Sequence, residues 1–295
     1  MSDTRSYRVV TLAVLAGLVG LMTLPLVDAA SLLHLRDILD GPDIVERRAV
    51  IDPRSSMIVW ATAALLGAVA WSARWSPTAP LSAAAGVAAT WTALALFPDS
   101  VGRVGDSLEP LLWDDAFGHL LDVGFASGPV IVAVLLGSAA AVAPGGWPRS
   151  RTTGASLLTA LAAPFLAGGT MLALDRCLAN RHEEISWGSA LGRELALLDA
   201  SLGWAVVAAV LILLVAASAR ISVAGPLTAA AALLAAWVVV VTKAGDLTVA
   251  AVTRTDGVFG VFPGLGGYGI TLGYLVFPLL AAVLLGTAAS QIRRA

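Results

Sequence analysis

Charged side chains are scarce in this chain. Only 13% of its 295 residues are Asp, Glu, Lys or Arg, whereas 58% are hydrophobic. Soluble domains carry about 25% charged residues, so this composition excludes a water-soluble domain of the same length and predicts a bundle of membrane-spanning segments. The single cysteine, Cys177, excludes an internal disulfide and any zinc or iron–sulfur site built from several cysteines.

Signatures of several common chemistries are also missing. The glycine-rich run 257–269 lacks the Gly-Lys-Ser/Thr of a phosphate-binding loop, and His182-Glu183-Glu184 lacks the second histidine of a zinc-protease helix. The nucleophile motif Gly-x-Ser-x-Gly does not occur. The sequence assigns no cofactor, and it indicates no nucleic-acid partner.

Eight apolar runs have the length of a helix that crosses a bilayer, about 20 residues. They cover residues 9–27, 56–73, 81–97, 117–143, 153–174, 198–219, 223–242 and 269–289. No ionisable residue falls deep inside these runs, which argues against a proton- or sodium-coupled pump with a site at the membrane midplane. We therefore expect an all-α integral membrane protein with eight transmembrane helices.

The connections between the runs differ in charge on the two sides of the membrane. Both ends of the chain and three short connections carry eight basic residues and one acid, whereas the four longer connections carry ten basic and nineteen acidic residues. Basic residues in short loops mark the cytoplasmic side. Because the composition is also typical of a GC-rich bacterial genome, we predict a multi-pass protein of the bacterial cytoplasmic (inner) membrane with both termini in the cytoplasm.

Parts of the chain recur in the same order. Residues 72–91 match residues 218–237 at an offset of 146, with arginine, proline and tryptophan in step. Residues 129–140 match residues 278–289 at an offset of 149. Alanine-rich helices match easily by chance, but arginine, proline and tryptophan do not, so the matches indicate an internal duplication.

The duplication predicts two tandem four-helix repeats, residues 1–146 and residues 147–295. Each repeat has an even number of spans, so the two insert in the same orientation and form parallel repeats related by an axis along the membrane normal. Pro25 in the first run has a counterpart in Pro164 of the fifth, which favours a retained first helix over a cleaved signal peptide.

Small residues should mark the contacts between helices. Gly124-x-x-x-Gly128 and Gly269-x-x-x-Gly273 would let backbones approach closely. Packing within the bundle is the preferred interpretation of both motifs, and a dimer interface is the alternative.

A polar triplet stands out at the start of the fourth run. Asp115, His119 and Asp122 are spaced by four and three residues, so a helix would place them on one face. Carboxylates beside an imidazole can hold a cation or orient the ring for proton transfer. The repeat has no equivalent triplet. We predict a ligand-binding site here, with solvated residues at a helix start as the alternative.

The remaining histidines also fall in segments expected outside. His34 lies in the first outer segment, and His182 lies in the third beside Glu183 and Glu184. Nothing in the spacing requires them to converge, so no metal site is predicted. We include these four residues as candidate ligand-binding residues on the outer face.

The outer segments 28–55 and 174–198 mix leucines with charged residues, which predicts amphipathic helices on the outer leaflet or over the ends of the spans. Such helices could frame a lateral opening for a lipid-like molecule. Covering the helix ends is the simpler function for them.

Three classes of function remain open. The first is transport or handling of a hydrophobic or amphipathic ligand through an outward-facing site between the two four-helix halves. The second is a membrane-embedded enzyme acting on a lipid-linked substrate at the outer leaflet, and the third is an accessory subunit of a membrane complex. The expected partners are the lipid bilayer and either a lipid-like ligand or a partner membrane protein.

Overall fold

The described part of the chain is almost entirely helical. The computed structural model describes residues 2–39, 53–96, 117–143, 153–187, 200–253 and 267–292, with side chains over shorter ranges, and no strand occurs within them. The helices are α1 (Ser2–Leu39), α2 (Pro53–Ser72), α3 (Thr78–Leu96), α5 (Phe117–Val142), α6 (Thr153–Trp187), α7 (Ala200–Ala217), α8 (Ala224–Thr253) and α9 (Gly267–Ile292), with the 3₁₀ turn η4 (Ser218–Arg220).

Length and apolar character make these helices membrane spans. The seven stretches that are long and apolar enough to cross a bilayer are Ser6–Ser31, Pro53–Ser72, Gly124–Val142, Thr153–Leu178, Ser201–Arg220, Ala224–Thr242 and Gly273–Ile292. α3 adds 19 residues without a charged side chain. The chain is therefore a multi-pass α-helical membrane protein, and the all-α prediction is confirmed for the described residues.

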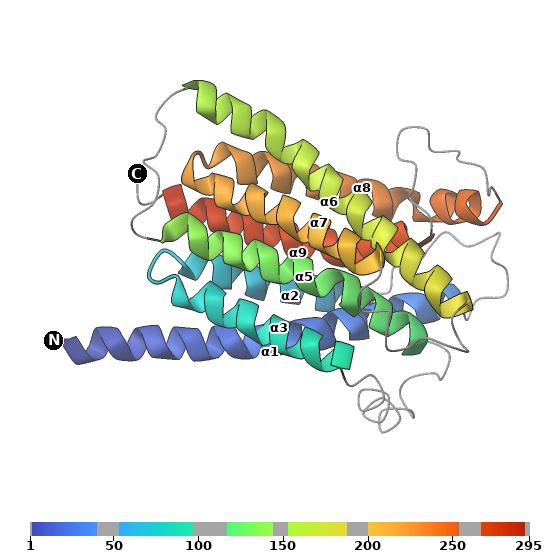
Figure 1. Cartoon of the computed structure of the whole chain (residues 1–295), viewed down its shortest axis with the longest axis horizontal. Coiled ribbons are helices and arrows are strands. Elements are labelled where there is room, and N and C mark those ends of the chain that lie inside the picture. Colours follow the sequence, from blue (N-terminus) through green and yellow to red (C-terminus); the bar gives the residue numbers. More distant parts are fainter. Residues whose placement is uncertain are drawn as a thin grey trace.

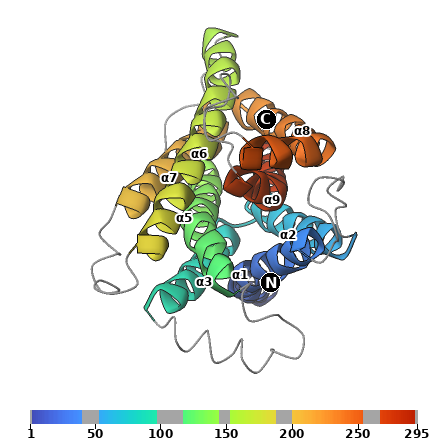
Figure 2. The ribbon, with the colours of Figure 1, turned by 90° about the vertical axis from the view of Figure 1, so that its right-hand side faces the viewer.

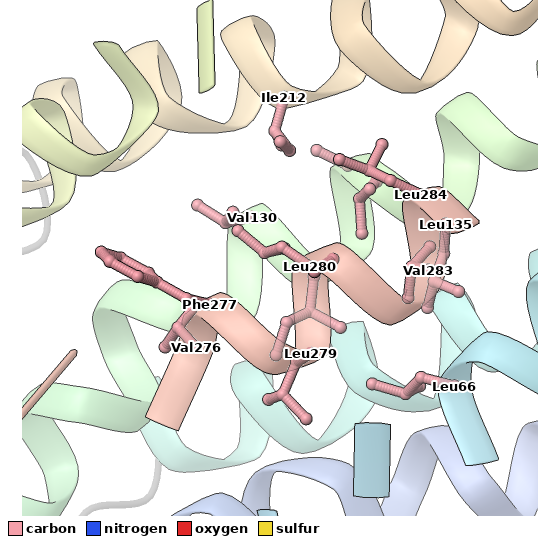
Figure 3. Packing of buried hydrophobic residues seen from close by; sticks show 14 of the residues in the cluster. Leu66, Val130, Leu135, Ile212, Val276, Phe277, Leu279, Leu280, Val283 and Leu284 are labelled. Carbon is pink, nitrogen blue, oxygen red and sulfur yellow. The ribbon is translucent and has the colours of Figure 1, made fainter. Parts of the chain in front are cut away.

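Two helices form the centre of the bundle (Figure 1). The spans of α5 and α9 are each 78% buried, whereas the other five range from 22% to 44%. Seen along the helices, α5 and α9 lie between α1, α2 and α3 on one side and α6, α7 and α8 on the other (Figure 2). Leu135 of α5 and Leu279 and Leu284 of α9 are among the fully buried side chains of this core (Figure 3).

The second helix of each half of the chain packs against the last helix of the other half. α2 lies along α9, and α7 lies along α5. Glycines mark both seams. A Cβ added at Gly137 of α5 would lie 2.6 Å from the Cβ of Ala216 in α7, and one added at Gly286 of α9 would overlap the carbonyl oxygen of Gly67 in α2. Side chains are absent from these points because the backbones approach so closely.

Matching hydrogen bonds recur in the two halves of the chain. The indole Nε1 of Trp91 donates to the carbonyl oxygen of Phe125 at 3.0 Å. The indole Nε1 of Trp237 donates to the backbone carbonyl oxygen of Tyr274 at 3.2 Å. Each bond ties the third helix of its half to the last helix of the same half. The hydroxyls of Ser138 and Thr287, 149 positions apart, meet at 2.5 Å between α5 and α9.

α1 and α6 continue past their apolar stretches as single helices. α1 runs without interruption to Leu39 and α6 to Trp187. The helices predicted within residues 28–39 and 174–187 are therefore continuations of α1 and α6, and in the first case no helix-breaking pair occurs before Gly41-Pro42. The remaining parts of the two outer segments lie largely outside the described residues.

Candidate functional site

The helices that carry the predicted site residues end at the same end of the bundle. We call this the distal end, because it lies opposite Ser2 of α1 (Figure 1). The last turns of α1, which carry His34, lie at this end. So do the last turns of α6, which carry His182, Glu183 and Glu184, and the first turns of α5, which carry His119 and Asp122. Asp115 and the side chains of the other six lie outside the described residues, so the predicted ligand-binding site at Asp115, His119 and Asp122 stays a prediction.

Hydrogen bonds between helices fix the geometry of the distal end. The hydroxyl of Ser55, near the start of α2, donates to the carbonyl oxygen of Ala30 in α1 at 2.8 Å. The next residue, Ser56, shares a 2.7 Å hydrogen bond with the phenol oxygen of Tyr274 in α9. Tyr274 is almost fully buried. These bonds join the end of α1 to the starts of α2 and α9.

Two embedded acids at this end were missed from the sequence. Asp28 lies within the apolar stretch Ser6–Ser31 and Asp175 within Thr153–Leu178. Asp175 is buried, and Asp28 is half-buried with its Oδ1 shielded from solvent. The apolar runs had been ended at residues 27 and 174, directly before each acid. The apolar residues after Asp28, Ala29 and Ala30, are the signal that the span continues.

The helix rise gives the depth of Asp28. α2 has 20 residues, which makes it about 30 Å long and equal to the hydrocarbon core of a bilayer. Ser55 is two residues from the start of α2, and its hydrogen bond places Ala30 at that level. Asp28 is two residues before Ala30 on α1, so it lies about 3 Å further from the distal end than Ala30 does.

Three buried oxygens in the distal half of the bundle have no hydrogen-bond partner. They are Oδ1 of Asp28, the hydroxyl of Ser31 and the hydroxyl of Ser127 in α5. Asp28 and Ser31 are three residues apart on α1 and therefore share one helical face. A buried polar oxygen without a partner costs free energy, so these oxygens mark a place where a donor or a cation would stabilise the protein.

The opposite, proximal end is closed by packing and by helix caps. Nη2 of Arg220 in η4 donates to the carbonyl oxygen of Ala143 at 3.0 Å, and Nε2 of Gln291 donates to that of Ala141 at 3.0 Å. Both bonds satisfy carbonyls at the end of α5 that have no partner in the helix. The guanidinium of Arg74 lies 3.5 Å from the ring centre of Trp71. The polar side chains named here therefore stabilise the packing of the helices at the proximal end.

Metal ligation finds no support in the part of the chain that the structure describes. Within it, no three His, Cys, Asp or Glu side chains form a group that could hold a metal ion. Cys177 is buried and carries no disulfide. Among the described side chains, the distal end offers the carboxyls of Asp28 and Asp175, serine hydroxyls and the phenol of Tyr274.

Comparison with known proteins gives no further assignment. No family model, no curated protein and no solved structure matches the chain. The function is therefore inferred from the contacts, burial and distribution of polar groups described above.

Proposed function

We propose that this protein handles a hydrophobic or amphipathic ligand at an outward-facing site between two tandem four-helix repeats. The repeats are residues 1–146 and 147–295, together they make eight spans, and both termini lie in the cytoplasm of a bacterium. The distal end is then the outer end. The main support for this function is that polar groups without partners lie at the distal end of the bundle, whereas the helices are closely packed nearer the proximal end.

Equivalent contacts support the repeat. The pairs Trp91–Phe125 and Trp237–Tyr274 are related by offsets of 146 and 149. In the first helices, Thr23 donates to the carbonyl of Val19 at 2.8 Å and Thr170 to that of Leu166 at 2.9 Å, an offset of 147. This offset replaces the pairing of Pro25 with Pro164, which are 139 positions apart. It also makes Asp28 and Asp175 equivalent, since 28 plus 147 is 175.

Polarity at one end and close packing at the other support an outward-facing site. The unpartnered oxygens of Asp28 and Ser31 lie at the distal end, as do the predicted site residues. Nearer the proximal end, the two halves touch through Ser138 and Thr287 and through the glycine seams. A molecule from the outer leaflet would reach polar groups at the distal end, whereas the packed seams would have to open before it could pass through.

The same packing also favours a second candidate, an accessory subunit. α5 and α9 meet through fully buried leucines and valines (Figure 3), so the described part of the interface between the halves is solid. An accessory subunit would need only this rigid scaffold and an outer surface that contacts its partner.

Quenching of tryptophan fluorescence by a spin-labelled amphiphile separates the two candidates. The protein in phosphatidylcholine nanodiscs is titrated with a doxyl-labelled hexadecyl chain that carries a hydroxyl headgroup. Handling of an amphiphile predicts a saturable component of quenching, which the His119→Ala variant loses while its expression and insertion stay normal. Linear quenching without saturation, equal in both proteins, would overturn the proposal and favour the accessory subunit.

A further inference from the structure

Each half of the chain carries one acid inside the distal part of its first span. Asp28 and Asp175 are equivalent at the offset of 147 that also relates Thr23 to Thr170. The neighbours agree in burial at the same offset, since Ala30 and Cys177 are both fully buried. An acid within a span is costly in an apolar surround, and its presence at the same place in both halves points to a function.

Two oxygens on one face of α1 are buried without a hydrogen-bond partner among the described residues. Oδ1 of Asp28 is buried without a hydrogen-bond donor, and the hydroxyl of Ser31, one turn further along α1, is buried without a partner as well. Ser31 is fully buried. A serine in a helix can usually bond the carbonyl of an earlier turn, so two unpartnered oxygens on one face define a built acceptor site.

The two halves differ in the residue that follows the acid. Asp28 is followed by Ala29, whereas Asp175 is followed by Arg176, whose side chain is exposed. The guanidinium next to Asp175 supplies a compensating positive charge in the second half. The acid of the first half has no such neighbour in sequence, so Asp28 is the one available to an external cation.

Depth decides which kind of cation fits. Asp28 lies three residues before the distal end of the apolar stretch Ser6–Ser31, where the headgroup of an amphiphile would meet its chain. A small hydrated ion would lose its water at this level, while an alkylammonium would keep its chain among the apolar side chains. Without Asp28, Asp175 and Arg176, which lie in the spans, the long connections assigned to the outer side carry seventeen acids against nine basic residues, an excess of eight acids that attracts cations.

We propose that Asp28 and Ser31 form a binding site for the positively charged headgroup of a cationic amphiphile, with Asp175 as a weaker counterpart in the second half. This proposal rests on the proposed function and names the chemical class of its ligand. The carboxylate pairs with the cation, and the Ser31 hydroxyl accepts from an N–H headgroup or orients the carboxylate.

The test uses two spin-labelled probes that differ only in the headgroup. Hexadecyl chains with a doxyl label and either a trimethylammonium or a hydroxyl headgroup are titrated into nanodiscs of zwitterionic lipid, and empty nanodiscs with a tryptophan ester give the partition background. We expect the wild type to bind the trimethylammonium probe about tenfold tighter than the hydroxyl probe, because an ion pair in a low-dielectric surround is strong. Asp28→Asn should reduce this preference to the small remainder that Asp175 contributes and leave binding of the hydroxyl probe unchanged.

Matched variants make the outcome decisive. Asp28→Glu keeps the charge and should retain the preference, Asp175→Asn should reduce it by a smaller factor, and Asp3→Asn at the opposite end of α1 should change nothing. An Asp28→Asn protein that still prefers the cationic probe tenfold overturns this inference, as does a wild type that binds both probes equally, and in either case the proposed function stands. Failure of both probes to bind saturably overturns the proposed function and this inference together.

Discussion

The seam between α2 and α9 gives a quantitative prediction. A Cβ added at Gly286 would overlap the carbonyl oxygen of Gly67 and lie 3.1 Å from the Cβ of Ala70. Both obstacles are backbone or short side chain, so neither can rotate away. Restoring van der Waals distances requires α2 and α9 to separate by about 1 Å. Forced separation of a packed interface costs about 1–3 kcal/mol.

Gly168→Ala in α6 is the matched control, because a Cβ there meets nothing within 4 Å. Both substitutions bring the same gain in helix propensity, up to about 1 kcal/mol, so the difference between the two variants measures the overlap alone. We expect Gly286→Ala to unfold roughly 2–10 °C below Gly168→Ala, measured as Tm by tryptophan fluorescence in one detergent. Equal Tm values for the two variants would refute the close approach of α2 and α9.

Further predictions concern the contacts between the halves and the topology. A disulfide should form between cysteines that replace Ser138 and Thr287, in a protein that also carries Cys177→Ala and a protease site between α6 and α7. After cleavage, this disulfide should hold the two fragments together on a non-reducing gel. Fragments that separate would contradict the contact. Trp237→Phe removes a hydrogen bond to the backbone of α9 and should lower the free energy of unfolding by about 1–2 kcal/mol in chemical denaturation, and an unchanged value would show that the bond contributes nothing. A cysteine introduced at Asp43, again with Cys177→Ala, should react with an impermeant maleimide in intact cells, and labelling only after permeabilisation would reverse the predicted topology.

The positions of the helices could be predicted from the sequence, because the length of an apolar run is nearly enough to identify a helix that crosses a bilayer. Each of the eight apolar runs overlaps one described helix, and α5 begins at residue 117 as expected. The ends were less accurate. α1 and α6 extend well past the apolar runs, since a helix continues until a breaker stops it, whatever the polarity of its last turns.

The pairing of helices could not be predicted, because lipid chains are as apolar as the protein core and the spans show no clear polar face. Gly128 and Gly273 were expected at close backbone contacts. Instead, a Cβ at Gly128 would meet the ring of Trp91 and one at Gly273 would meet Val240. The closest backbone approach in the α2–α9 seam is made by Gly286, which stands in the small-residue pattern Ala282-x-x-x-Gly286 and not in a Gly-x-x-x-Gly motif.

The candidate site was predicted only in part for a related reason. The helical spacing of His119 and Asp122 was visible in the sequence, and both fall on one helix. Asp28 and Asp175 each follow the last residue of a predicted apolar run, because an acid interrupts the apolar pattern even where the helix and its apolar stretch continue. The proposed pairing of Asp28 with Asp175 follows from the offset of 147 that separates the hydrogen bonds of Thr23 and Thr170, which the sequence alone does not reveal.

The exchange of α2 and α7 between the halves sets the order in which the protein can be assembled during synthesis. α2 leaves the ribosome early, yet its partner α9 follows all the other described helices in the chain. Until α9 is inserted, the backbone groove at Gly67 remains uncovered and α5 lacks its central neighbour. A nascent chain that stalls before α9 therefore presents an unfinished surface to membrane quality-control proteases, and neither half can mature before the other.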